Sequence, residues 1–255
     1  MLDQVKLQSL LCIDIETVPE FQHFSELDAE MQTLYLQKSA RLHLEHETEQ
    51  EKYFNHAGIY AEFGRIVCIS LGIFHKERKT GTISFRVKSF SGIDEKTILT
   101  EFISLLNTYY KDPLKYFFAG HNIREFDIPF ICRRLLINQL KMPAILDISG
   151  RKPYDVNHLD TMQLWRFGDY KNYTSLKLLA RILQIESPKD DINGSDVGRV
   201  FWNDNNLLRI VTYCERDVIT VAQLLCRYKG VALLEANQII HTSSPLTSNL
   251  SRGRS

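Results

Sequence analysis

Two carboxylates, Asp14 and Glu16, come at the end of a run of branched apolar residues that begins at Leu7. The run predicts a central strand over residues 7–15 that is buried on both faces. Residues two apart in a strand share a face, so these two side chains would project together. Their mutual repulsion disfavours the charged forms unless a cation lies between them. This spacing is common in proteins, so a metal-binding role for Asp14 and Glu16 depends on which other side chains lie close to them.

A third carboxylate, Asp127, stands two residues before Pro129 at the start of a helical pattern. Proline is favoured in the first turn of a helix, and aspartate is favoured as a helix cap. Capping is therefore one explanation of Asp127, and taken alone it is the better one. The small and polar residues 120–122, at the end of a predicted strand, indicate instead a crevice that Asp127 would share.

Tyr213 and Asp217 are four residues apart in a predicted helix over 205–228, so they are neighbours on one face. They lie on the flank of the apolar stripe of this helix, at the boundary of the core. Taken alone, a tyrosine–aspartate pair at a core edge is the more common explanation. In combination with the other carboxylates, the pair indicates a fourth acidic contribution to one site.

Residues 165–173 interleave four aromatic side chains with two basic ones, including Trp165, Arg166 and Lys171. This composition is typical of surfaces that bind single-stranded nucleic acid, where bases stack and cations meet phosphates. Aromatic residues that anchor a loop to the core would give the same pattern equally well. Both interpretations stay open at this point.

The remaining elements predict an α/β domain with a mixed sheet. Paired strands are expected over 66–74 and 82–90, with shorter strands over 115–119 and 158–160. Helices are expected after Asp94 and over 175–183. Residues 21–62 hold eight acidic residues against three Lys or Arg, with helical spacing of apolar positions, and predict a helical insertion after the first strand. We expect one domain over 1–241 and a disordered Ser/Thr-rich tail over 242–255.

The whole-chain composition narrows the class of protein. The formal net charge is zero, which argues against tight, sequence-blind coating of long nucleic acids. No stretch approaches the ~20 consecutive apolar residues of a membrane helix, and the start lacks the regions of a signal peptide. The five cysteines have no zinc-site spacing, which is typical of buried thiols in a reducing compartment. We expect a cytoplasmic protein without membrane association.

Three segments of the chain together resemble a known family. Residues 13–17, 120–130 and 213–217 resemble the three exonuclease motifs of family B DNA polymerases, which belong to the DEDD superfamily of 3′–5′ exonucleases. The tyrosine subclass fits because the histidine of the other subclass would stand at the position of Thr212. More narrowly, residues 57–67 are similar to stand-alone exonucleases related to the polymerase proofreading domain. The acidic insertion and the neutral charge depart from polymerase domains.

The resemblance implies a ribonuclease H-like fold and a two-metal mechanism with Mg²⁺ or Mn²⁺. By resemblance, Asp14 bridges the two ions, Glu16 and Asp217 complete the first site, and Asp127 holds the second. Tyr213 would orient the attacking water, because a phenol with an ordinary pKa near 10 is a poor base. The implied contacts to the terminal nucleotide come from Thr17, Asn122 and Phe126, while Asp160 is expected to be structural.

The substrate implied by the resemblance is the 3′ end of single-stranded DNA. The same chemistry on RNA ends is the nearest alternative, because nothing in the sequence reports on a 2′-hydroxyl. A different class is a non-catalytic nucleic-acid-binding module that has kept the fold and lost the activity. Such a module would be expected to lack one of the carboxylates, and none is missing.

Overall fold

Six strands form one mixed sheet in the computed structural model, in the order β5-β4-β1-β2-β3-β6. The structure describes residues 2–42, 44, 46–152, 155–169, 173–186 and 192–242. The strands are β1 (Leu10–Pro19), β2 (Gly64–Lys76), β3 (Ile83–Ser91), β4 (Phe117–Gly120), β5 (Leu159–Asp160) and β6 (Ile239–His241). The pairs β1–β2 and β2–β3 are antiparallel, whereas β4 runs parallel to both β1 and β5, and β6 runs parallel to β3.

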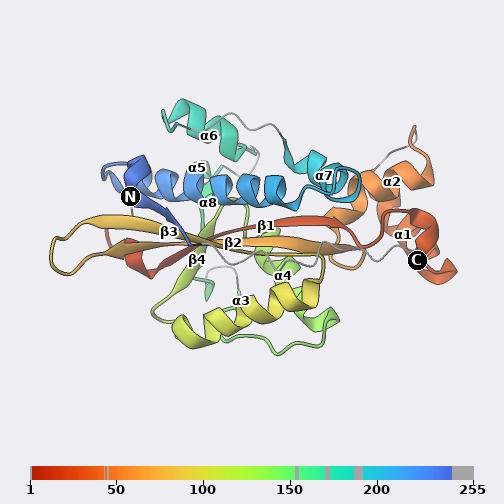
Figure 1. Cartoon of the computed structure of the whole chain (residues 1–255), viewed down its shortest axis with the longest axis horizontal. Coiled ribbons are helices and arrows are strands. Elements are labelled where there is room, and N and C mark those ends of the chain that lie inside the picture. Colours follow the sequence, from red (N-terminus) through yellow and green to blue (C-terminus); the bar gives the residue numbers. More distant parts are fainter. Residues whose placement is uncertain are drawn as a thin grey trace.

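Helices cover both faces of this sheet. They are α1 (Ala29–Ser39), α2 (Glu49–His56), α3 (Glu95–Tyr109), α4 (Asp127–Ile137), α5 (Thr161–Arg166), α6 (Leu176–Ile182), α7 (Val197–Trp202) and α8 (Leu207–Lys229). The long helix α8 lies along one face of the sheet and α3 lies along the other (Figure 1). The expected α/β architecture, a ribonuclease H-like mixed sheet flanked by helices, is confirmed.

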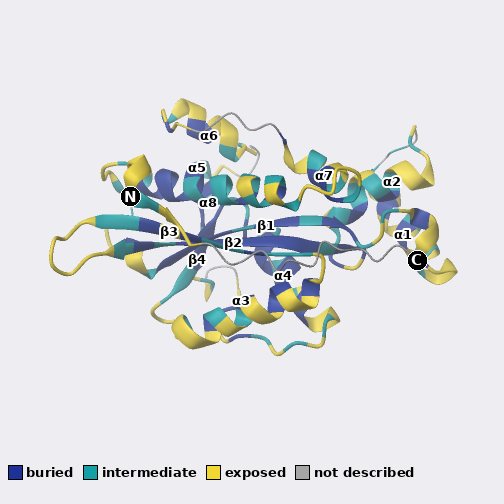
Figure 2. Cartoon of the chain, in the orientation of Figure 1, coloured by how far each residue is buried: buried dark blue, intermediate teal, exposed yellow. Residues whose placement is uncertain are grey.

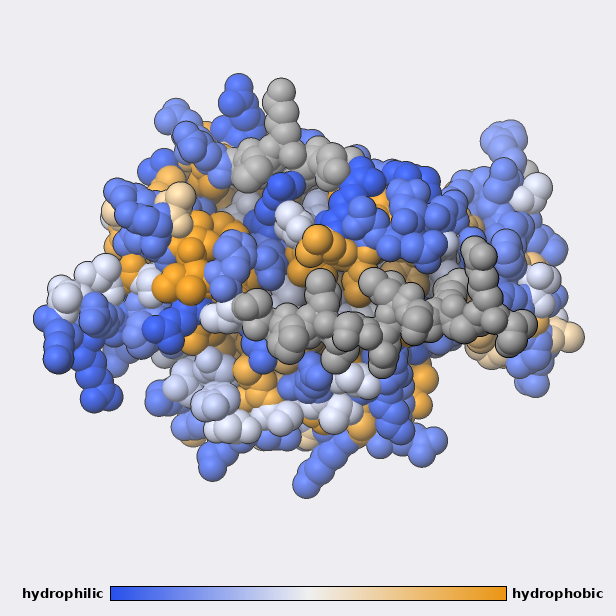
Figure 3. Space-filling view, viewed as in Figure 1, coloured by the Kyte–Doolittle hydropathy of each residue, from blue (hydrophilic) through white to orange (hydrophobic). Residues whose placement is uncertain are grey.

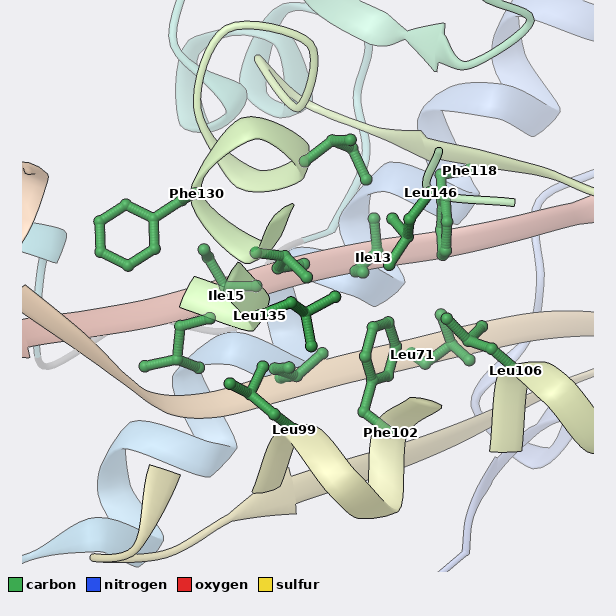
Figure 4. Close-up of a cluster of buried hydrophobic side chains, with 14 of the residues drawn as sticks. Ile13, Ile15, Leu71, Leu99, Phe102, Leu106, Phe118, Phe130, Leu135 and Leu146 are labelled. Carbon is green, nitrogen blue, oxygen red and sulfur yellow. The ribbon is translucent and has the colours of Figure 1, made fainter. Parts of the chain in front are cut away.

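Alternation along β1 divides the core between the two faces. Leu11, Ile13 and Ile15 join the large cluster under α3 and α4, part of which is drawn in Figure 4. Leu10 and Cys12 face the other way, into a cluster with the apolar stripe of α8. The central strands β1 and β2 are largely buried, whereas the helices carry exposed residues (Figure 2). Asp14 and Glu16 follow the parity of Leu10 and Cys12, so they face α8.

The first strand differs from the expectation at both ends. Residues Leu7–Ser9 form a single turn of 3-10 helix, and the strand continues beyond Ile15 to Pro19. The polar residues at 16 and 17 stay in the sheet because β2 pairs with them as far as the Pro19–Gly64 pair. Asp14 and Glu16 therefore lie inside a strand rather than at its end.

The insertion after β1 is helical, as expected. It contains α1, α2 and three single turns of 3-10 helix, Phe24–Glu26, Ala40–Leu42 and Ala57–Ile59. It has a small aromatic core of its own, in which Tyr35 packs edge-on against both Tyr53 and Phe63 with ring centroids 5.2 Å apart. Thr48 caps α2 through a capping box with Glu51.

The C-terminal expectations are only partly covered by the described residues. Thr242 is hydrogen-bonded to the carbonyl of Val87 through its backbone N–H and its hydroxyl, both at 2.8 Å. The tail for which we expect disorder lies outside the described residues beyond Thr242, so that expectation stays a prediction there. No helix in the described ranges is both long enough and apolar enough to cross a membrane.

A glycine in β2 sets the distance between α8 and the sheet. A Cβ atom at Gly72 would lie 2.2 Å from the ring of Phe85 and 2.7 Å from Cγ1 of Val218. Both neighbours are buried in the same cluster, so neither has free space into which it can move. Gly72 thus permits the close approach of the helix that carries Tyr213 and Asp217.

We predict that Gly72→Ala lowers the free energy of unfolding by about 2 kcal/mol, within the range for overpacked cores. Urea denaturation followed by circular dichroism measures the change. Gly194→Ala is the matched control, because a Cβ there meets nothing within 4 Å. Equal stability of the two variants would show that the contact between α8 and the sheet is looser than the structure indicates.

Candidate active site

A break in the regular pairing of β1 and β2 lies beside the two strand carboxylates. Glu16 is opposite Cys68, but the next residue, Thr17, is opposite Ile66, so β2 has one additional residue at Val67. Such bulges increase the local twist and redirect side chains, and they are frequent next to active sites. Glu16 is buried and Asp14 is partly buried on the side of the sheet that faces α8.

Asp127 reaches this place from the edge of β1. The pairing of β4 with β1 covers only Leu10–Cys12, so among the described residues no strand pairs with that side of β1 further along. The backbone N–H of Ile15 donates to Oδ1 of Asp127 at 3.1 Å. The cap of α4 is Phe126, without a side-chain hydrogen bond, so the capping explanation of Asp127 is wrong.

The loop before Asp127 is held by Asp160. Its carboxylate accepts the backbone N–H groups of Asn122 at 3.0 Å and Arg124 at 3.2 Å, and it also caps α5. Asn122 has a φ of 66°, a conformation that asparagine tolerates better than most residues. Its Oδ1 is buried and has no hydrogen-bond partner within the described ranges. Asp160 thus holds the loop that carries Asn122, which is consistent with the structural role expected for it. The side-chain oxygen of Asn122 remains available as a hydrogen-bond acceptor.

Helix α8 supplies the remaining groups. Ile210, Cys214 and Val218 form its buried stripe, and Tyr213 is partly buried beside it against the apolar cluster of α7. The thiol of Cys214 lies 3.4 Å from the carbonyl oxygen of Asp14 and donates to it. Ligand atoms of Asp14, Glu16 and Cys214 all lie within 4.8 Å of one another. The sequence interpretation missed Cys214 as a neighbour of the site, although it stands directly after Tyr213.

The electrostatics show that the four acidic groups act on one another. Burial raises the pKa of Asp14 well above its ordinary value, and the charges of Asp217 and Asp127 raise it further. Burial likewise raises the pKa of Glu16, followed by the charges of Asp14 and Asp217. The pKa of Asp127 is raised to about 7, chiefly by burial. The structure therefore brings the four predicted carboxylates within mutual electrostatic range.

The donor set fits a hard divalent cation. Oδ2 of Asp14 is buried without a hydrogen-bond partner in the described part of the chain. Buried polar atoms are normally paired, so an orphan oxygen beside other carboxylates indicates a ligand position. Carboxylate oxygens suit Mg²⁺ and Mn²⁺, and a cation among them would offset their repulsion.

A comparison with protein families decides the relationship of the chain. A family model described as a predicted 3′–5′ exonuclease related to the exonuclease domain of PolB matches residues 59–250. The chain belongs to this exonuclease family. The matched segment contains Asp127, Tyr213 and Asp217, whereas Asp14 and Glu16 precede it. No curated protein shows significant similarity to the chain.

Not all of the residues expected to contact a substrate are free to do so. The hydroxyl of Thr17 donates to the carbonyl of Gly58 at 2.7 Å and so fastens the insertion to β1. Phe126 is partly buried with its ring 5.4 Å from that of Phe130. Trp165 packs against the buried cluster of α6, which supports the anchoring explanation of this aromatic.

Arg166 keeps an unused donor. Its Nη1 lies 3.6 Å from Oε1 of Glu125, and its Nε is buried without a partner among the described residues. Lys171 lies outside the described residues, so its expected role stays a prediction. Of the 165–173 segment, Arg166 is therefore the described residue whose geometry suits a phosphate.

A buried ion-pair network fixes α4, the helix that carries Asp127. Arg134 on this helix binds Glu95 through Nε and Nη2, Glu20 at 2.9 Å, and the carbonyl of Ala61 at 2.9 Å. Arg134 and Glu95 are both buried. The network joins α4 to α3 and to both ends of the insertion. This network could not be predicted from the sequence, because its partners are far apart in the chain.

We predict that ionisation of Asp127 destabilises the metal-free exonuclease. Because its folded pKa of about 7 lies above the ordinary value, its stabilising contribution is present below about pH 4 and is lost as pH rises through 7. In EDTA, Asp127→Asn should match the wild type near pH 4 and exceed it at pH 8 by on the order of 2 kcal/mol. Urea unfolding at each pH measures the difference.

Addition of Mg²⁺ at pH 8 provides the control for that experiment. The ion should stabilise the wild type more than the Asn variant, because the variant keeps the ligands of one ion position and lacks a ligand charge at the other. A stability difference in EDTA that does not change between pH 4 and pH 8 would contradict the proposed burial of this carboxyl.

Proposed function

We propose that the protein is a 3′–5′ exonuclease of the tyrosine subclass that hydrolyses single-stranded DNA with two divalent ions. The observation that supports it most is that the charges of Asp127 and Asp217 act on Asp14 and Glu16, beside an Asp14 oxygen that is buried without a hydrogen-bond partner among the described residues. The family relationship supplies the reaction class. The position that would hold histidine in the other subclass is Thr212, whose hydroxyl is bound to the carbonyl of Leu208.

The carboxylates would divide the ions between them. Asp14, on which the charges of both Asp217 and Asp127 act, would be the shared ligand, with Glu16 and Asp217 completing one position and Asp127 the other. Two divalent ions in such a site neutralise the scissile phosphate and acidify the attacking water. Asp127 is held in place by the N–H of Ile15, which leaves its second oxygen for this purpose.

The side chains around the carboxylates would bind and orient the substrate. Tyr213 is one helical turn before Asp217 and would place the attacking water through its hydroxyl. The buried Oδ1 of Asn122 would accept from the terminal sugar or base, and Nε of Arg166 would meet a phosphate. DNA and RNA ends share these features, and we take DNA as the first substrate to test because of the family's relation to the PolB domain.

We predict that hydrolysis requires Mg²⁺ or Mn²⁺ and that Asp14→Ala or Asp217→Ala lowers the rate by at least ~10³-fold. Removing a ligand carboxylate removes the charge that holds an ion at the scissile phosphate. The assay follows 5′-labelled single- and double-stranded DNA and RNA with Mg²⁺, Mn²⁺ or EDTA. Asp169→Ala, a change of an acid outside the site, is the control. Activity of either ligand variant above a few per cent of wild type would refute the assignment.

For Tyr213→Phe we predict a loss of ~10²-fold in kcat with little change in stability or metal binding. The substitution removes one hydroxyl and keeps the ring that packs against the α7 cluster. Single-turnover kinetics, thermal unfolding and Mn²⁺ titration measure the three quantities. An unchanged kcat would show that Tyr213 only packs, and the tyrosine subclass would then lack a mechanistic basis.

A further inference from the structure

Two parts of this neutral chain that lie at opposite ends of the molecule carry opposite net charge. The acidic insertion, with eight acidic residues against three Lys or Arg, continues from one end of β1. Residues 75–91 and 109–116 together hold seven Lys or Arg against two acidic residues. Figure 1 shows the β2–β3 hairpin at one end of the molecule and α1 and α2 at the other. Both ends are strongly hydrophilic in the space-filling view (Figure 3).

We give the name basic–aromatic face to the basic residues at this end together with the neighbouring tyrosines: residues 76–79 of the hairpin, Arg86 and Lys88 of β3, and residues 109–116. Arg86 and Lys88 share the parity of Phe90, whose ring packs in the cluster under α3. The positive charge of Arg86 acts on Tyr110, where burial and Tyr116 raise the phenol pKa and Arg86 opposes the rise. The end of α3 and the outer part of β3 therefore meet at this face.

Aromatic rings and cations alternate across the face. Tyr110 packs edge-on against Tyr116 at 5.1 Å, and Tyr109 lies 6.3 Å from Tyr110 with 66% of its side chain exposed. Nζ of Lys115 lies 4.8 Å from the centre of the Tyr116 ring. Lys111 and Arg86 are exposed. The packed pair of tyrosines thus supports an exposed ring and several free cations.

This combination suits single-stranded nucleic acid. Cations along a face bind successive phosphates, and an exposed ring held by its neighbours can stack on an unpaired base. A duplex would leave the ring without a partner, because its bases are already stacked. The acidic insertion repels phosphates from the opposite end of the molecule, so a strand that leaves the site is drawn toward the basic end.

The face is separate from the candidate active site. Asp14 is opposite Ser70 in the β1–β2 register, and Arg86 is opposite Ile73, three residues further along β2. That is about 10 Å along the strand. Arg86 also points to the α3 side of the sheet, whereas the carboxylates face α8. A strand would have to pass around the sheet to occupy both places, so the shortest substrates would not reach this face.

We propose that the basic–aromatic face is a second binding site for single-stranded nucleic acid, which holds the strand upstream of the 3′ end. The proposal rests on the proposed exonuclease function for the direction of the strand. The binding itself does not require hydrolysis. Long strands would gain affinity from the second site, and short ones would not.

The test measures binding in EDTA by fluorescence anisotropy, with labelled oligo(dT) and oligo(U) of about 30 nucleotides. The variant Arg86→Ala/Lys111→Ala/Lys115→Ala should reduce the slope of log K against log salt by about 2, since each single-strand phosphate contact contributes about 0.7. The loss of affinity should reach about 100-fold at 0.1 M salt, because the salt dependences converge near 1 M. Tyr109→Ala should weaken binding about tenfold and leave the slope unchanged.

The matched control is Lys96→Ala/Lys141→Ala/Lys177→Ala, which removes the same charge from exposed positions elsewhere. It should change neither the slope nor the affinity beyond twofold. Equal losses in the two triple variants would overturn the proposal, because only total charge would then matter. Tight binding by the wild type with an unchanged slope in the first triple variant would also overturn it.

A hydrolysis assay distinguishes the failure of the second binding site from the failure of the proposed exonuclease function. With Mn²⁺, the first triple variant should raise KM for the long strand and leave kcat on a substrate of about five nucleotides unchanged. A wild type that binds through this face and hydrolyses nothing would refute the exonuclease proposal and leave the binding site established. A wild type that binds neither long strand would overturn the binding site directly.

Discussion

Repulsion among four acidic groups that are buried or partly buried is the constraint on which the site depends. Burial is the largest cause of the raised pKa of Asp14, Glu16 and Asp127; the charge of Asp217 raises all three further, and that of Asp160 also acts on Asp127. A folded protein gains nothing from gathering carboxylates in one buried place without a counter-charge. The arrangement is therefore that expected of the protein ligands of a cation. Without the cation, the carboxylates would hold protons instead.

Several unrelated features maintain this arrangement against the repulsion. Gly72 lets α8 approach the sheet, and the thiol of Cys214 joins that helix to the backbone of Asp14. Gly120 allows the loop after β4 to turn tightly, because a Cβ there would lie 2.8 Å from the carbonyl oxygen of Ile13. Asp160 and Arg134 then fix the two ends of the segment that delivers Asp127. The site is thus built by packing and hydrogen bonds that are independent of any ion.

Many of the helices and strands were predictable because local sequence patterns determine them. Hairpin strands, the Asp94 cap of α3 and the apolar stripe of α8 follow from alternation, capping chemistry and helical periodicity. The extent of β1 was not predictable, because Glu16 and Thr17 are polar and only the pairing with β2 keeps them in the strand. The sequence alone could not decide whether Asp127 caps a helix or belongs to the site. Its hydrogen-bond donor is the N–H of Ile15, which is 112 residues away in sequence. Trp165 could be assigned to the core only once α6 was placed beside it.

A calorimetric titration of the metal-free protein with Mn²⁺ near pH 6.5, in two buffers of different ionisation enthalpy, tests the metal site most directly. We expect binding to release protons, because carboxyls whose pKa is raised by burial must lose them when the ion enters. The number of protons released should fall as the starting pH is raised to 8. Binding without proton release at pH 6.5, or no binding of Mn²⁺ at either pH, would contradict the claim that these four carboxylates form a metal site.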